Sequence, residues 1–382
     1  MTNCYPFAVV YSRLRVASPS MYSTPFVLSF SLLLSLPILF LLAPHIFPSP
    51  STLQITPADE QDDLSLFSRA AESLSVRPSS FSHLSSRRAN FKIAFLFLTN
   101  TDLYFSPLWD QFFSPKNRNL YNVYVHADPI SNVTRPRSGV FKDRFIDHAK
   151  RTYRASPTLV SATRRLLATA ILDDPANAFF AVVSQYCIPL HSFRFVYDSL
   201  LNSPSFDHSA SPSDLTHGGV RVLYKSFIEI LSKEPRMWKR YVARGRYTML
   251  PEVPYENFRV GSQFFVLTRR HALLVVKDRK LWKKFKLPCY RENECYPEEH
   301  YFPTLLAMND PDRCTRYTLT HVNWTGTTNG HPYTYKPTEI NPKLIHTLRV
   351  SNHSDSYLFA RKFTPDCLEP LLKIADKVIF QD

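Results

Sequence analysis

Residues 92–99, KIAFLFLT, and residues 121–129, YNVYVHADP, decide the fold class of this chain. Both contain apolar runs that lack the strict alternation of a half-exposed strand, and such runs suit strands covered on both faces of a mostly parallel sheet. A helical pattern at 161–172 and a third apolar run at 179–183 continue the alternation of strands and helices. The sequence therefore predicts an α/β fold.

The strand ends indicate where a ligand would bind. A later strand is expected at 263–268, followed by a helix at 269–276. In an open α/β sheet the ligand lies beyond the carboxyl ends of the strands. Asp128 ends the run 123–128 and is therefore a candidate ligand-binding residue. Asp-Pro is also a common way to begin a turn, so both interpretations stay open here.

Residues 295–306, CYPEEHYFPTLL, contain the best candidate for a catalytic base. Pro297 suits the first position of a helix, which places Glu298 and Glu299 in the first turn, against the positive end of the helix dipole. Residues at helical spacing follow, so we expect an amphipathic helix with one packed face and an open entrance. The alternative is an acidic first turn on an ordinary surface helix.

The N-terminal part predicts a membrane anchor. The run 26–43 holds no charged residue and is about long enough to cross a bilayer. Arginines precede it and the first acidic residue follows it, so the positive-inside rule keeps the short N-terminus in the cytosol. A cleaved signal peptide is the rival interpretation. The predicted organisation is a cytosolic tail (1–25), a transmembrane signal anchor (26–43), a Ser/Pro-rich stem (44–89) and a lumenal domain (90–382).

Three N-glycosylation sequons agree with a lumenal domain: Asn132, Asn323 and Asn352. Of the six cysteines, five would be lumenal, so at least one thiol stays free or pairs between chains, which leaves a homo-oligomer open. Cys289, Cys295 and Cys314 surround the acidic motif, but no C-x-x-C or H-x-x-x-H pair accompanies them. The spacing therefore does not favour a zinc site.

The formal net charge of +14 favours an anionic substrate, because nucleic acid is an implausible partner in a secretory lumen. Sugar nucleotides carry a diphosphate, and a site without a metal needs Lys and Arg to neutralise it. The strongest candidates are Arg349 and the pair Arg361 and Lys362 in YLFARKF. A solvated basic face is the alternative. There is no P-loop and no G-x-G-x-x-G, which excludes the common glycine-rich phosphate sites.

Seven stretches in this order resemble the core-2/I-branching glycosyltransferases of family 14, in particular the plant branch of the brittle-culm type. They are KIAFLFLT (92–99), YNVYVHADP (121–129), AVVSQYCIPLHSF (181–193), RVGSQFFVLTRRHA (259–272), CYPEEHYFPTLL (295–306), THVNWTG (320–326) and YLFARKF (357–363). The resemblance implies a single-pass type II Golgi membrane glycoprotein with a lumenal GT-A-like, Rossmann-related domain. It also implies inverting transfer from a UDP-sugar donor to a glycan acceptor.

Site residues follow from the resemblance position by position. Glu299 matches the family's catalytic base and Glu298 its structural neighbour, next to His300. Asp128 matches the residue that contacts the uridine of the donor. Lys362 matches the residue that binds the diphosphate. The remaining candidates are Arg349 and Arg361 for phosphate binding, Gly261 and Ser262 for shaping the site, and Trp324 for packing on the acceptor.

The resemblance implies no cofactor and no metal. The only D-x-D is Asp310-Pro311-Asp312, which we interpret as a turn after a helix. The donor sugar would be N-acetylglucosamine or glucuronic acid, and the acceptor a cell-wall or arabinogalactan-type glycan. The alternative is a catalytically inactive lumenal relative that binds glycan or nucleotide, because Asn323 stands where many plant relatives carry Asp. A zinc hydrolase using Glu299 and His300 lacks further ligands.

Overall fold

The computed structural model describes residues 29, 33–37, 55–73, 91–201, 205–206, 222–327 and 330–382. Residues 53–382 form one compact unit and residues 1–52 another. Within the described ranges, no helix is both long and apolar enough to cross a bilayer. Most of the predicted anchor at 26–43 lies outside these ranges, so the anchor stays a prediction.

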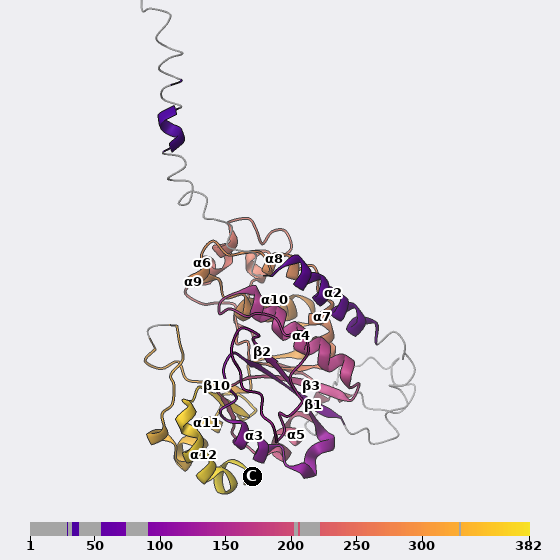
Figure 1. The fold of residues 1–382 in the computed structure, drawn as a ribbon, viewed down its shortest axis with the longest axis vertical. Helices are drawn as coiled ribbons and strands as arrows, with labels where there is room; N and C mark the ends of the chain where they lie inside the picture. Colours follow the sequence, from indigo (N-terminus) through magenta and orange to yellow (C-terminus); the bar gives the residue numbers. More distant parts are fainter. Residues whose placement is uncertain are drawn as a thin grey trace, which may run out of the picture. The chain divides into compact units, whose positions relative to one another are not determined.

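A six-stranded sheet forms the centre of the larger unit (Figure 1). Its order is β2 (Tyr121–Ala127), β1 (Lys92–Thr99), β3 (Asn177–Ser184), β8 (Val266–Thr268), β7 (Ser226–Glu229) and β9 (Cys314–Arg316). The central strand β1 pairs in parallel with both neighbours, so that Phe95 lies between Val123 and Ala181. Only β8 runs against the others. The predicted α/β fold with a mostly parallel central sheet is confirmed.

Helices cover both faces of this sheet, which explains why the strands lack alternation. Figure 1 shows α2, α4, α7 and α10 on one face and α3, α5, α11 and α12 on the other. Their bounds are α2 (Pro57–Glu72), α4 (Pro157–Asp173), α7 (Arg269–Lys277), α10 (Pro297–Asn309), α3 (Ser106–Phe112), α5 (Phe193–Leu201), α11 (Pro342–Arg349) and α12 (Leu368–Ile374). Three short helices lie outside these layers: α6 (Met237–Tyr241), α8 (Trp282–Phe285) and α9 (Glu292–Cys295).

An aromatic cluster holds the second layer of helices against β1. The Phe95 ring lies 5.8 Å from Phe112 and 6.4 Å from Phe193, measured between centroids. It also meets Phe359 edge-on at 6.2 Å. Edge-to-face contacts of this kind add to the free energy gained by burying the rings. Residues from three distant parts of the sequence therefore pack around one strand.

Helix α2 differs from the predicted stem. Leu66, Phe67 and Ala70 are buried, and the helix packs against α4 and α7. Its buried Asp63 carboxylate lies 2.6 Å from the Arg165 guanidinium of α4. This helix was not predicted, because its apolar residues stand within a Ser- and Pro-rich region. The folded domain therefore begins before Pro57 and not at residue 90.

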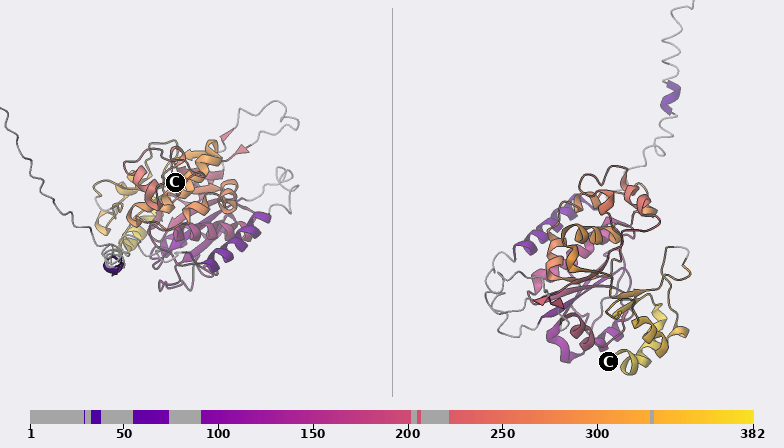
Figure 2. Two further views of the ribbon diagram at one scale, coloured as in Figure 1. Left: turned by 90° about the horizontal axis from the view of Figure 1, so that it is seen from above. Right: turned by 180° about the vertical axis from the view of Figure 1, so that it is seen from behind.

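A second sheet of three strands brings the C-terminal motifs together. Its order is β10 (Thr320–Val322), β11 (Phe359–Arg361) and β4 (Cys187–Pro189). β10 and β11 run in parallel, with Val322 opposite Arg361. Figure 2 shows the C-terminal segment, in yellow, gathered at one end of the domain. A further pair, β5 (Ser205–Phe206) and β6 (Val222–Leu223), flanks residues that the structure does not describe.

Candidate active site

The entrance of α10 is fixed by the segment before it. A disulfide joins Cys289 to Cys295, and Tyr296 adopts a left-handed conformation with φ of +39°. Pro297 then begins the helix, where its missing N–H costs no hydrogen bond. The turn is constrained on both sides, so the first helical residues have a fixed direction.

Glu299 is the only residue of 297–306 that is not buried. The expected amphipathic pattern is therefore wrong in extent, because both the sheet side and the opposite side of α10 are covered. His300, Tyr301 and Thr304 have no exposed surface, while Glu299 keeps 32% of its side chain exposed. The first turns of α10 are packed on all sides, so the backbone that carries the accessible Glu299 carboxylate is held in a fixed position.

Arg240 from α6 holds the Glu299 carboxylate. Its Nη1 lies 2.6 Å from Glu299 Oε2, and its guanidinium lies 5.0 Å from the centre of the Tyr296 ring. Among the described residues none hydrogen-bonds to Glu299 Oε1. Charge-assisted pairing of this kind fixes the orientation of a carboxylate. Glu299 thus has one oxygen held by the protein and one oxygen available to a substrate hydroxyl.

Glu298, the neighbouring acid, is in a different environment. It is 4% exposed, and its Oε1 accepts the Ala155 backbone N–H at 3.0 Å. Burial raises the pKa of Glu298 to about 8, with a further increase from the Glu299 charge. His300 is also buried, which lowers its pKa to about 3, and its Nδ1 lies 2.7 Å from the Arg259 carbonyl oxygen. These two side chains brace the entrance, and this placement favours the structural role predicted for Glu298.

Gly261 and Ser262 lie directly beside Glu299. The Gly261 N–H donates to the Glu299 carbonyl oxygen at 2.8 Å. A Cβ on Gly261 would lie 1.9 Å from the Glu229 carbonyl oxygen, so only glycine fits between the two segments. The Ser262 N–H donates to the carboxylate of Glu229, whose pKa burial raises. Glu229 ends β7, so a third carboxylate reaches this part of the site.

Three cations, Arg154, Arg361 and Lys362, lie near these acids, and among the described residues none of them pairs with a carboxylate. Arg361 follows β11's apolar residues and lies 4.2 Å above the Phe264 ring. Burial lowers the pKa of Arg361. The negative charge of Glu299 raises this pKa, and the positive charge of Arg154 lowers it. Burial also lowers the pKa of Lys362, together with the charges of Arg361 and Arg154. Within the described ranges, none of the three forms an ion pair with Asp or Glu, which leaves an anion-binding cluster.

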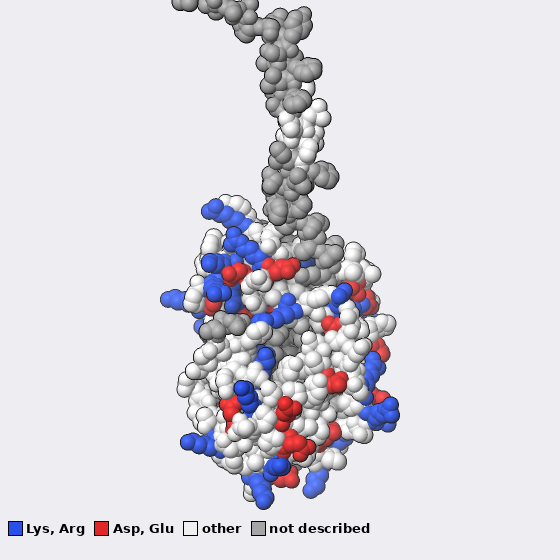
Figure 3. All heavy atoms as spheres, turned by 60° about the vertical axis from the view of Figure 1, so that its left-hand side comes forward, with Lys and Arg blue, Asp and Glu red and all other residues white. Residues whose placement is uncertain are grey.

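Arg154 also connects the cluster to the loop after β10. Its Nη1 lies 2.7 Å from His331 Nε2, and its Nη2 donates to the Gly330 carbonyl oxygen at 2.9 Å. The pKa of His331 is lowered by desolvation and by the charges of Arg154, Lys362 and Arg361. Figure 3 shows Lys and Arg side chains around a recess on one face of the molecule.

The other two donor-binding candidates have protein partners. Asp128 is 6% exposed; its Oδ1 accepts the Ile130 N–H, and its Oδ2 accepts both the N–H and the hydroxyl of Thr152. Arg349 donates from Nε to the Leu190 carbonyl and from Nη2 to the Val378 carbonyl, each at 2.8 Å. No contact in the described part of the chain joins Arg349 to the cation cluster. Their donor-binding roles stay predictions.

Trp324 is 55% exposed, on the loop that follows β10. Asn323, beside it, is half-buried: its Nδ2 donates to the Tyr335 hydroxyl at 3.3 Å and its Oδ1 accepts the Thr325 N–H at 2.9 Å. The sequon residues Asn132 and Asn352 are exposed. Accessibility therefore favours a glycan at these two positions over one at Asn323, whose amide already has partners.

The other acidic and cysteine residues considered as candidates contribute to turns, a disulfide or the buried core. Asp310 lies at the end of α10, and its Oδ2 is 2.5 Å from Arg270 Nε, so the D-x-D is part of a turn as predicted. Cys289 is in the disulfide and is no zinc ligand, while Cys187, Cys314 and Cys367 are free and buried. The described residues contain no cluster of three or more side chains suited to a metal.

Sequence reasoning missed Arg154, Arg240 and Glu229. Arg240 stands in a stretch with four other basic residues at 236–246, and its acidic partner is distant in the sequence. Arg154 precedes a helix start without a recognisable motif. Glu229 was detectable in principle, because it ends a strand at the carboxyl edge of the sheet, but that strand was not predicted.

An accessible carboxylate near a cationic cluster, on a mostly parallel α/β domain, is an arrangement suited to group transfer from an anionic donor. A family model described as Core-2/I-Branching enzyme matches residues 93–349. A rice protein (Oryza sativa subsp. japonica) named "Glycosyltransferase BC10" is 30% identical over 325 residues, covering 72% of this chain and 74% of the rice protein. The chain therefore belongs to the Core-2/I-branching enzyme family, and it is a glycosyltransferase.

Proposed function

We propose that this glycosyltransferase moves a sugar from a UDP-sugar to a glycan hydroxyl, with inversion and without a metal. The observation that carries the proposal is the accessible Glu299 carboxylate, held by Arg240, beside three cations that form no ion pair with a carboxylate in the described part of the chain. A base for the acceptor and a counter-charge for a diphosphate are the two groups that such a transfer needs.

The proposed reaction is a single displacement. Glu299 Oε1 takes the proton from the acceptor hydroxyl while that oxygen forms a bond to the anomeric carbon. The bond between this carbon and the β-phosphate oxygen breaks, and its electron pair leaves with UDP. Attack opposite to the leaving group inverts the anomeric configuration. Lys362 and Arg361 stabilise the negative charge that develops on the diphosphate.

The preorganised geometry supports this division of roles. Arg240 occupies only Glu299 Oε2, so the base is oriented before substrate binds. Glu298 is buried and its pKa is about 8, which favours its neutral form at the pH where Glu299 would act. The two adjacent acids thus differ in access as well as in protonation.

The donor sugar that we propose is N-acetylglucosamine or glucuronic acid, and the acceptor a cell-wall or arabinogalactan-type glycan. The proposed place is the Golgi, with an N-terminal anchor and a lumenal domain. Similarity to a plant glycosyltransferase of the same family supports this context. Asn323 does not favour an inactive relative, because its amide fits its turn through two hydrogen bonds.

The experiment is UDP release by the purified protein in EDTA, with a panel of UDP-sugars and β-galactan acceptors. Donor-specific release in EDTA is expected, and Glu299→Gln is expected to abolish it. UDP binding without release across the whole panel would contradict the transferase assignment and support the inactive relative. Release that requires added Mn²⁺ would contradict the metal-independent mechanism.

A further inference from the structure

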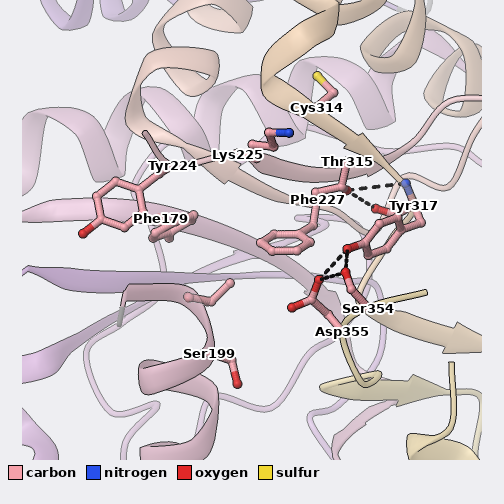
Figure 4. Close-up of a pocket in the computed structure, with 11 residues that line it drawn as sticks. Phe179, Ser199, Tyr224, Lys225, Phe227, Cys314, Thr315, Tyr317, Ser354 and Asp355 are labelled. Atoms are coloured by element: carbon pink, nitrogen blue, oxygen red, sulfur yellow. Dashed lines mark hydrogen bonds between the residues drawn. The ribbon is translucent and has the colours of Figure 1, made fainter. Parts of the chain in front are cut away.

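A second hollow lies away from the candidate active site (Figure 4). Its volume is about 360 Å³, within the size range of pockets that bind small ligands. The lining comes from β3, from α5, from β7 and the two residues before it, from β9 and the loop after it, and from the segment before β11. Ser199, Lys225, Phe227, Thr315, Tyr317 and Asp355 are among the residues that line it.

The topology separates this hollow from Glu299. β7 runs antiparallel to β8, and β8 antiparallel to β3, so β7 has the direction of β3. β9 is parallel to β7. The hollow includes residues at the start of β7 and β9, whereas Glu229 at the other end of β7 reaches the active site. Among the described residues that line the hollow, none is Glu299 or one of the three cations of the active site.

Two smaller hollows adjoin it through Ser354 and Asp355, which line all three. One has a volume of about 150 Å³ and shares Ser199 and Phe227 with the first. The other has a volume of about 270 Å³ and follows residues 349–356. We call these three neighbouring hollows together the groove, and their combined extent suits a chain of several units better than one small molecule.

The walls of the groove combine fixed aromatic rings with hydrogen-bonding groups. Tyr317 stacks on His353 with ring centroids 4.1 Å apart, and it meets Phe227 at 6.0 Å. Its hydroxyl lies 3.0 Å from Ser354 Oγ and donates to the Asp355 carboxylate. Figure 4 shows Phe227, Tyr317 and Asp355 facing the same space. The rings are held in place, so a ligand would not have to order them.

This chemistry matches a neutral oligosaccharide. The apolar faces of pyranose rings pack on aromatic side chains, and their hydroxyls bond to carboxylate, hydroxyl and ammonium groups. In the main hollow, the Asp355 carboxylate faces the same space as the Lys225 ammonium, so a nucleotide diphosphate gains no net attraction there. The active site has the opposite balance, with three cations that have no carboxylate partner among the residues the structure describes.

We propose that the groove around Ser354 and Asp355 is a second carbohydrate-binding site, which holds a neutral oligosaccharide chain while the active site acts elsewhere on the glycan. This binding needs neither donor nor transfer, so it stands or falls independently of the proposed reaction. The sequon at Asn352 adjoins the groove, and a glycan attached there would be a second source of the same chemistry.

Hydrogen–deuterium exchange with neutral β-linked tetrasaccharides of galactose, glucose, xylose and N-acetylglucosamine tests the proposal, in an Asn352→Gln background that removes the attached glycan. At least one of them is expected to protect residues 224–229, 314–317 and 351–357. Ser199→Phe places a large side chain in the space shared by two of the hollows. Binding at this site is expected to weaken about tenfold, because the ligand can no longer reach the aromatic and hydrogen-bonding groups there. The exposed Ser138→Phe is the matched control and should leave the protection unchanged.

Three results would overturn the proposal. The first is the absence of protection in these segments across the whole panel. The second is protection that Ser199→Phe leaves unchanged. The third is protection in the sequon-intact protein that disappears in the Asn352→Gln background, which would leave only the attached glycan as occupant. Glu299→Gln should keep the protection, because Glu299 does not line any of the three hollows.

Discussion

The two sides of the candidate active site differ in how their charges are compensated. On the base side, Arg240 pairs with Glu299 at 2.6 Å and lies 3.7 Å from Glu234. On the donor side, Arg361 and Lys362 have lowered pKa values and no carboxylate partner among the described residues. On the base side the charges are already paired before substrate binds, whereas on the donor side a bound anion would supply the negative charge that pairs with the cations. Base and leaving-group stabilisation are therefore separable by mutation.

The largest expected effect is on the base side. Glu299→Gln keeps the size of the side chain and its contact with Arg240 but cannot take a proton. Transfer should fall by about 10²- to 10⁴-fold, the usual contribution of a general base. Calorimetry should show UDP affinity within about threefold of wild type, because the donor side is intact. Near-normal turnover in this variant would exclude Glu299 as the base.

On the donor side, Lys362→Met removes the charge and retains the aliphatic part of the side chain. UDP affinity should fall about 10- to 100-fold, as for a lost hydrogen bond to a charged group. The wild-type affinity should also decrease with salt more steeply than that of the variant. The exposed Lys343→Met is the control. Equal losses in both variants would show that only the overall positive charge matters.

Arg349 provides a third test, because its predicted donor role competes with its observed contacts. Arg349→Met removes the donors for three carbonyl groups and a 3.2 Å contact with Asp382. The free energy of unfolding should fall by about 2 kcal/mol, with UDP affinity of the folded protein unchanged. Arg194→Met, at an exposed ion pair, should change stability by less than about 0.5 kcal/mol. A selective loss of UDP affinity would instead confirm the donor role.

The last test concerns the pH dependence of stability and Glu298. Its pKa of about 8 in the folded state exceeds the usual 4.5, so the folded state holds a proton that the unfolded state releases. Stability from this group is full below pH 4.5 and is lost as pH rises toward 8, by up to about 1.4 kcal/mol per pH unit. Glu298→Gln should remove this slope in urea unfolding between pH 5.5 and 7.5. Parallel slopes for wild type and variant would contradict the neutral, buried role, and the exposed Glu292→Gln is the control.

The central strands and the helix after Pro297 could be predicted because their signals are local. A continuous apolar run such as 93–98 indicates a strand that is buried on both faces. A proline followed by two acidic residues indicates the start of a helix. The same locality explains the error at α2, where a weak apolar pattern in Ser- and Pro-rich surroundings became a helix through its contacts with α4 and α7.

Residues that are neighbours along the chain were enough to predict β1, β2, β3 and β8, the acidic helix entrance and the family motifs. The folded structure was needed to show that Arg240 holds Glu299, that Arg154 joins Arg361 and Lys362, and that Glu298 is buried while Glu299 is not. These facts depend on contacts between distant segments, and on burial, which sets the protonation of an acid through the surroundings that fold around it.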